Sequence, residues 1–218
     1  GKESEEVRDY VLSLVYEKYN QREIEYPVEY ALSMTYSGDS ANVYQFDSLA
    51  KWAKHKYNAD LNPSELQDMS FHQVEEKLMA IAHENTPEKV LAEVEEKIQS
   101  LGAEEAIKWS AQRFGFNLEA ENAPKDAEQL KNQVHEFMRR ELSRLERYVL
   151  LQVFDAAWKD HLYAMDRLKE SVSLRRFAEK DPRIEYKHEG YRMFSDMLES
   201  IENRVTDTVF KLRLEANA

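Results

Sequence analysis

The sequence predicts a mainly α-helical fold, with a helical domain over residues 1–140 and a long antiparallel pair of helices over residues 141–218. Only 5 of the 218 residues are glycine and only 5 are proline, so few positions interrupt a helix. Apolar residues recur three and four positions apart in most segments, as they do on one face of a helix. Hydrophobic residues make up 42% of the chain and charged residues 33%, which is typical of a folded chain with a charged surface.

Local signals place several helices within residues 1–140. Ser70 can act as an N-cap, and Gln73 three residues later completes a capping box. Thr86 and Pro87 form a typical helix start, and Gly102 can close that helix in the left-handed conformation. The apolar spacing predicts helices over residues 7–15, 47–57, 71–81, 87–101 and 103–114.

One stretch departs from the helical spacing. Residues 24–36 alternate between apolar and other side chains, and a Ser-Gly-Asp-Ser turn signal follows at residues 37–40. This pattern predicts a small β-hairpin over residues 24–46. Ala, Leu, Met and Glu in the same stretch also suit a helix. The sequence therefore leaves a β-hairpin and a helix as alternatives here.

Two apolar stripes predict the pair of long helices. One runs from Leu151 to Met165 and the other from Tyr191 to Leu212, each within about 100° of the helix surface. The connection over residues 173–187 is long enough for the two helices to fold back as an antiparallel pair. The side chains predicted to pack in this pair are Trp158, His161, Leu162, Met165, Phe194, Leu198 and Ile201.

The net charge is −12, which argues against non-specific binding of nucleic acid because such binding needs a basic surface. The charge is unevenly distributed. Residues 167–192 hold eight basic and five acidic residues, a balance of +3, and −15 remains for the rest of the chain. This segment is expected to approach a negatively charged partner. The alternative is a solvated helix end with scattered salt bridges.

No catalytic or metal-binding pattern is present in the sequence. The six histidines lack the spacing of metal ligands, and there is no cysteine for a thiolate zinc site or a disulfide. No two glycines have the spacing of a phosphate-binding loop. The longest near-apolar stretch, residues 148–154, is far shorter than the about 20 residues that cross a bilayer. We therefore expect no catalytic residue, no metal and no membrane span.

Short motifs in the second half resemble a known family. The match runs from about residue 144 to 214 and is similar to the C-terminal helical scaffold of the SecA preprotein translocase ATPases. This resemblance implies that the helical pair is a two-helix finger and that residues 1–140 form a helical wing-like domain. The motifs are Trp158-Lys159-Asp160-His161-Leu162, Met165-Asp166, Leu174-Arg175, Lys180-Asp181-Pro182, Glu185-Tyr186-Lys187, Met193-Phe194 and Met197-Leu198.

The resemblance also implies a role for the tip of the finger. In the SecA family this tip reaches into the cytoplasmic mouth of the SecYEG channel and touches the polypeptide being moved. Phe177 occupies the tip position where the family usually has tyrosine, so its ring is expected to contact the polypeptide. Arg175, Arg176, Lys180 and Arg183 are expected to contact acidic channel loops or lipid headgroups.

Further expectations concern partners and location. By resemblance the SecA-like parent is a protein-translocating ATPase that uses ATP and Mg, whereas this chain alone is expected not to be an enzyme. The implied partners are the SecYEG channel, unfolded preprotein and missing motor domains of the same chain. The implied location is the cytoplasm, peripheral at the inner face of the bacterial plasma membrane.

The chain starts at Gly1 with neither methionine nor a signal-peptide core, which predicts a piece of a longer protein. By resemblance, the apolar stripes of the finger pack partly against a scaffold helix that this sequence does not contain, which predicts self-association through the uncovered stripes. The alternative function is a stand-alone helical adaptor that binds other proteins.

Overall fold

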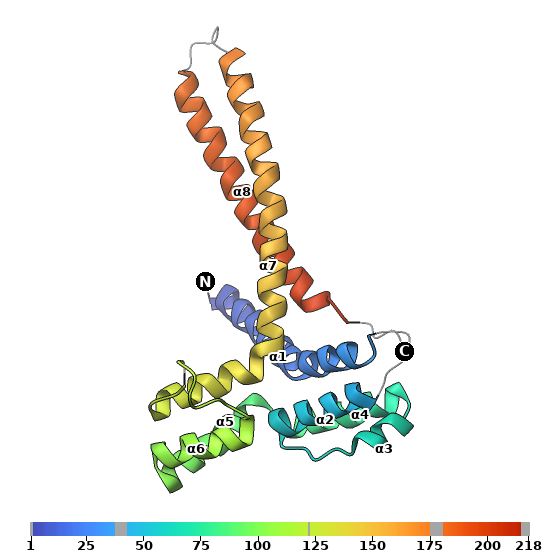
Figure 1. The fold of residues 1–218 in the computed structure, drawn as a ribbon. Helices are drawn as coiled ribbons and strands as arrows, with labels where there is room; N and C mark the ends of the chain where they lie inside the picture. Colours follow the sequence, from blue (N-terminus) through green and yellow to red (C-terminus); the bar gives the residue numbers. More distant parts are fainter. Residues whose placement is uncertain (1, 38–42, 122, 175–180, 215–218) are drawn as a thin grey trace. The chain divides into compact units, whose positions relative to one another are not determined.

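The computed structural model of the chain describes residues 2–37, 43–121, 123–174 and 181–214 (Figure 1). Within these ranges it contains eight α-helices and no β-strand, so the predicted mainly α-helical fold is confirmed. The helices are α1 (Lys2–Thr35), α2 (Val43–Tyr57), α3 (Pro63–Asp68), α4 (Phe71–Glu84), α5 (Pro87–Leu101), α6 (Ala103–Phe114), α7 (Ala127–Leu174) and α8 (Pro182–Lys211).

The chain divides into two compact units. The first consists of Gly1–Leu142 with Arg213–Ala218, and the second consists of Ser143–Leu212. The division falls inside α7, so this helix begins in the first unit and ends in the second. The second unit is therefore an insertion between two parts of the first. The sequence-based domains 1–140 and 141–218 stay a prediction.

The stretch that alternates in the sequence is helical. α1 continues through Pro27 to Thr35, so the predicted β-hairpin does not form in the described part of residues 24–46, and the helix alternative is correct. The period-two run also contains a helical set, because Val28, Ala31, Leu32 and Thr35 are buried at positions i, i+3, i+4 and i+7. Packing of this face selects the helix. Residues 38–40 of the predicted turn lie outside the described residues.

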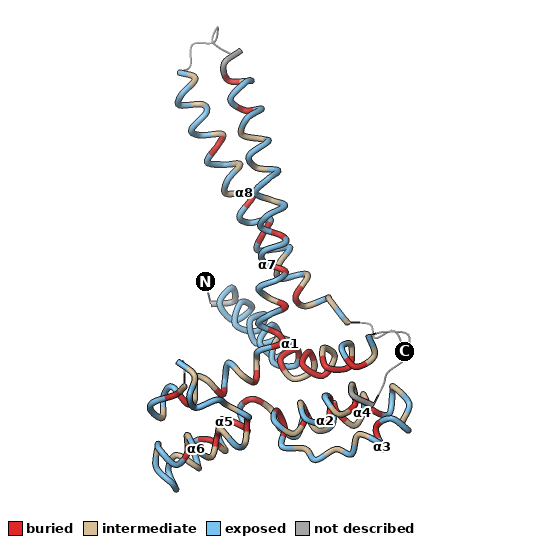
Figure 2. The backbone as a smooth tube through the Cα atoms, in the orientation of Figure 1, coloured by how far each residue is buried: buried red, intermediate tan, exposed pale blue. Residues whose placement is uncertain are grey.

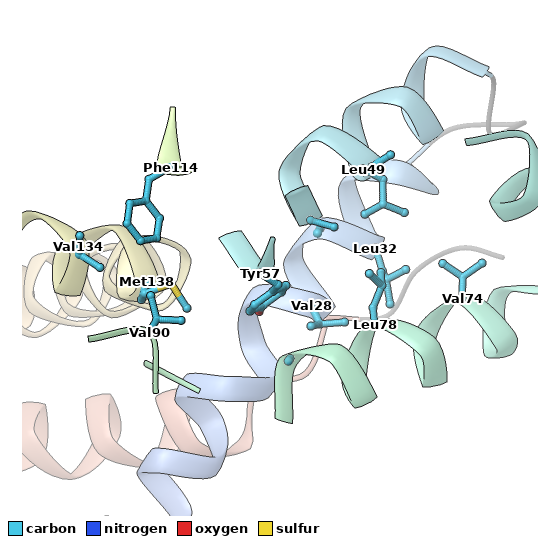
Figure 3. Packing of buried hydrophobic residues seen from close by; sticks show 14 of the residues in the cluster. Val28, Leu32, Leu49, Tyr57, Val74, Leu78, Val90, Phe114, Val134 and Met138 are labelled. Atoms are coloured by element: carbon cyan, nitrogen blue, oxygen red, sulfur yellow. The ribbon is translucent and has the colours of Figure 1, made fainter. Parts of the chain in front are cut away.

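An apolar core joins α1, α2, α4, α5, α6 and the beginning of α7 in the first unit. Val28 and Leu32 of α1 pack beside Leu78 of α4 (Figure 3). Each fully buried aliphatic side chain contributes about 1.5–3 kcal/mol relative to an exposed one. Phe114 of α6 and Met138 of α7 belong to the same core.

Helix ends follow the predicted capping signals with one difference. The Ser70 side chain accepts a hydrogen bond from the Gln73 backbone N–H, and the Gln73 side chain accepts one from the Ser70 backbone N–H, so the capping box is confirmed. Pro87 starts α5 as predicted. Gly102 ends α5 with φ +82° and ψ 164°. This positive-φ conformation favours glycine, differs in ψ from the predicted left-handed helical one, and leads the chain directly into α6.

The second unit is an antiparallel helical hairpin formed by residues 143–174 of α7 and by α8 (Figure 1). His161 of α7 lies beside Phe194 of α8, and Met165 of α7 lies beside Gly190 of α8. The residue numbers of the contacting positions rise along α7 and fall along α8, so the two helices are antiparallel. A Cβ atom at Gly190 would come within 2.9 Å of the Met165 Cε, so any larger residue there would require the flexible end of Met165 to move. The buried residues of the unit (Figure 2) are Leu145, Val149, Val153, Leu168, Val172, Gly190, Met197, Ile201 and Val209.

Candidate functional site

The connection between α7 and α8 carries most of the predicted tip contacts. Arg175, Arg176, Phe177 and Lys180 lie outside the described residues, so their roles stay predictions. Arg183 lies in the first turn of α8 with an exposed side chain. Of the five predicted tip residues, Arg183 is therefore the one that the described part of the structure contains.

A cap determines where α8 starts. The Asp181 side chain accepts a hydrogen bond from the Arg183 backbone N–H at 2.9 Å, and Pro182 occupies the first helical position. The proline ring presets φ for a helix, and the carboxylate satisfies one of the free N–H groups of the first turn. These two features therefore fix the start of α8 at Pro182.

The side chains predicted to pack in the helical hairpin differ widely in burial. Ile201 is buried, and His161 and Met165 are half-buried. Trp158 is 38% exposed and Leu162 is 49% exposed. Phe194 and Leu198 are exposed to a similar degree as Trp158. Their placement does not test the packing role, which stays a prediction.

Six of the exposed apolar side chains of the second unit form a set on α7 and α8 that we call the hairpin apolar face. The Phe154 and Trp158 rings stack with their centroids 6.1 Å apart, and Trp158 lies 5.7 Å from the His161 ring. His161 in turn meets Phe194 of α8 at 5.8 Å, which links the surfaces of the two helices. The face consists of Leu151, Phe154, Trp158, Leu162, Phe194 and Leu198. An aromatic surface of this kind is suited to binding a partner.

A groove with a volume of 370 Å³ lies between α7 and α8. Small side chains at Ala157 and Ala164 leave this space open, and Arg204, Asp160 and Asp196 place both signs of charge along it. The remaining lining residues are His161, Met193, Met197 and Ser200. Its mixed lining suits an elongated segment with apolar and charged groups better than an enclosed small molecule.

A buried polar contact holds the beginning of α7 in the first unit. Lys56 of α2 is 1% exposed and forms an ion pair with Glu141 of α7, which is 7% exposed. The Glu141 carboxylate also accepts a hydrogen bond from the Trp52 Nε1 at 3.2 Å. Burial lowers the pKa of Lys56, and the neighbouring Glu141 carboxylate opposes this shift. The sequence carries no local signal for the pair because its members are 85 positions apart.

Arg139 makes a second polar contact on another side of α7. It forms an ion pair with Glu23 of α1 and donates a hydrogen bond to the Tyr19 hydroxyl. Positions 139 and 141 are separated by about 200° around a helix. The beginning of α7 is therefore fixed to α1 through one face and to α2 through nearly the opposite face.

Comparison with known families shows to which family the chain belongs. Residues 3–213 match the family described as SecA Wing and Scaffold domain. The chain belongs to the SecA wing and scaffold family. No solved structure matches the chain.

Curated SecA proteins align with most of this chain. It is 31% identical over 219 residues to protein translocase subunit SecA 1 of Rhodopirellula baltica, with 89% of the chain and 18% of the relative covered. It is 32% identical over 170 residues to protein translocase subunit SecA of Helicobacter acinonychis, with 73% and 18% covered. The chain thus spans about a fifth of the length of these relatives.

The SecA family match reaches further than the short motifs did. The motifs covered residues from about 144 to 214, whereas the match begins at residue 3 and includes α1 to α6. Those helices are built from ordinary amphipathic patterns, which many helical proteins share.

Two further findings concern the described ranges alone. They contain no group of three or more His, Asp or Glu side chains placed to hold a metal ion. None of their helices combines the length and the apolar character needed to cross a membrane.

Proposed function

We propose that this chain is the wing and scaffold part of a SecA-type protein translocase and that its helical hairpin contacts the polypeptide in transit. The family match over residues 3–213 carries this proposal. The antiparallel register of α7 and α8, marked by the contact of His161 with Phe194, supports it, because an arm of two paired helices can hold a tip in a defined position.

Phe177 is the residue we propose for the polypeptide contact. A translocase handles many sequences, and an aromatic ring supplies stacking and apolar contact without requiring a particular hydrogen-bond partner. The 30-residue helix α8 that follows it would be about 45 Å long and forms a stiff support. In this proposal Arg175, Arg176, Lys180 and Arg183 orient the tip against acidic channel loops or anionic headgroups, each contact being weak on its own.

ATP and Mg belong, in this proposal, to other parts of the longer protein. The two described glycines with positive φ, Gly102 and Gly115, each end a helix, and neither lies in a strand-to-helix loop that could cradle phosphates. These two glycines of the described ranges therefore do not fit a nucleotide-binding loop. The chain contributes binding and positioning while the nucleotide is hydrolysed elsewhere.

The partners that follow are the SecYEG channel and unfolded preprotein, with the protein located in the cytoplasm and peripheral at the inner face of the plasma membrane. The basic balance of residues 167–192 within an acidic chain supports an approach by this end to a negatively charged surface.

The test uses the full-length translocase with SecYEG in membrane vesicles. Phe177→Ala should reduce preprotein transport at least tenfold and leave basal ATPase and the melting temperature nearly unchanged, because only a tip contact is lost. Phe177→Tyr should retain transport because the ring remains. Normal transport by a stable Phe177→Ala protein would refute the tip assignment.

A matched control is available close to the tip. Ile184 is an exposed apolar residue in the first turns of α8, so Ile184→Ala removes a similar apolar surface without changing the proposed contact. It should transport at the parent rate. Equal losses from Ile184→Ala and Phe177→Ala would show that the whole tip acts as a non-specific apolar surface.

A further inference from the structure

The beginning of α7 packs in the first unit through an apolar row that repeats every four residues. Leu130, Val134, Met138 and Leu142 are all buried. A shift of α7 along its axis by four residues, about 6 Å, would bring three of these four side chains to the place of a neighbour. The row therefore keeps apolar side chains at three of its four sites after such a shift, while the fourth site would receive Asp126 or Glu146.

The polar contacts of α7 do not repeat in this way. Four residues before and after Glu141 stand Phe137 and Leu145, and neither carries a charge to meet Lys56. Four residues before and after Arg139 stand His135 and Ser143, and both are shorter than arginine and lack its permanent charge. A one-turn shift would leave a buried ammonium group opposite an apolar side chain, which is costly.

We propose that the Lys56–Glu141 ion pair, aided by Arg139, is a register lock that selects one axial position of α7. Buried ion pairs often add little net stability compared with apolar side chains of similar size. Their best-established contribution is to exclude alternative registers. The same helix continues past Leu142 to Leu174. The lock therefore determines the axial position of a helix whose far end belongs to the second unit, whether or not the chain serves a translocase.

Phe137 limits how far the equilibrium can move. Its ring lies 5.8 Å from Phe114 and 5.5 Å from Phe116, a shape-specific contact that a shifted helix would lose. We therefore expect the native register to remain the major one when the ion pair is replaced, with the shifted register appearing as a second population. This makes the prediction one of added heterogeneity and not of complete conversion.

The test replaces the pair by apolar residues, Lys56→Met with Glu141→Leu, in the complete 218-residue chain. Because the sequence has no cysteine, cysteines placed at Lys51 and Glu136, both exposed, can carry spin labels without interference. Distances between the labels should form one population in the parent. The double variant should show a second population displaced by up to about 6 Å, the rise of four residues.

Two further variants sharpen the result. Adding Arg139→Met with Glu23→Leu should increase the second population. Replacing Lys131 and Glu95, a largely exposed ion pair between α7 and α5, by Met and Leu should leave one population, because an exposed pair constrains little. A folded double variant with a single, unchanged distance would overturn the lock. Unfolding of that variant would overturn it as well, because the pair would then serve stability and not register.

Discussion

Three tyrosines of the first unit have a titration behaviour that differs between the folded and unfolded chain. Burial raises the pKa of Tyr26, Tyr36 and Tyr57 above the ordinary value of 10.0. Above pH 10 the unfolded chain releases protons that the folded chain keeps, so the free energy of unfolding falls as the pH rises. Below pH 10 their contribution to stability is fully present. Burial lowers the pKa of Lys56, so below pH 10.5 the titration of this group makes the free energy of unfolding rise with pH.

Tyr57→Phe is expected to weaken this alkaline loss of stability. Above pH 10.5, where more than half of the lysine side chains in the unfolded chain are neutral, the parent should lose up to about 1.4 kcal/mol per pH unit for each such tyrosine. The slope for Tyr57→Phe should be smaller by up to that amount. Urea unfolding between pH 10.5 and about 11.5 measures it. Tyr16→Phe on the exposed part of α1 is the control, and equal slopes in both variants would contradict the assignment.

Residue-level reasoning from the sequence succeeds where the signal is local. Ser70 and Gln73 are three positions apart and form their cap as predicted. Lys56 and Glu141 meet across 85 positions, and α2 alone gives no reason for a lysine to be buried. Such a pairing depends on how α2 and α7 pack, which no window of sequence contains.

At the scale of elements, the caps of α4 and α5 allow a matched comparison. Ser70→Ala should lower the free energy of unfolding by about 1 kcal/mol because it removes the hydrogen bond to the Gln73 N–H. Thr86 occupies the same position before α5, but its side chain makes no capping hydrogen bond, so Thr86→Ala should change stability by a few tenths of a kcal/mol at most. Urea unfolding of both variants tests the difference, and equal losses would contradict it.

The helical hairpin shows which part of an element can be predicted. Apolar spacing predicted two long helices, and the structure contains both. The spacing could not decide which stripe of α7 is buried, because Val149 and Val153 make one apolar row and Leu151, Phe154 and Trp158 make another. For residues 24–36 the apolar spacing was compatible with both a β-strand and an α-helix. The packing of Val28 and Leu32 in the core selects the helix.

At the scale of the whole molecule, the uncovered apolar surfaces predict self-association of the isolated chain. The hairpin apolar face is one such surface, and α1 exposes another along Val7, Tyr10, Val11, Leu14 and Val15. Leu151→Gln combined with Leu162→Gln should weaken association at least tenfold, since burying each leucine is worth about 1.5–3 kcal/mol. Light scattering across a concentration series measures the change.

The control for this prediction is Met34→Gln. Met34 is as exposed as the leucines but belongs neither to the hairpin apolar face nor to the exposed stretch of α1 over residues 7–15, so its replacement should leave association unchanged. A chain that stays monomeric at high concentration would show that the exposed faces do not bind one another.

The insertion of the second unit into the first has a consequence for how the protein is made. Arg213 of the first unit forms an ion pair with Glu29 of α1 at 3.8 Å, yet the ribosome completes every residue of α7 and α8 between synthesising these partners. The ribosome starts at the N-terminus and adds about 5–20 residues per second. Several seconds therefore pass between the synthesis of α1 and the synthesis of Arg213. The nascent chain must therefore assemble its helical hairpin, or hold it open, while the unit that surrounds it in sequence is still incomplete.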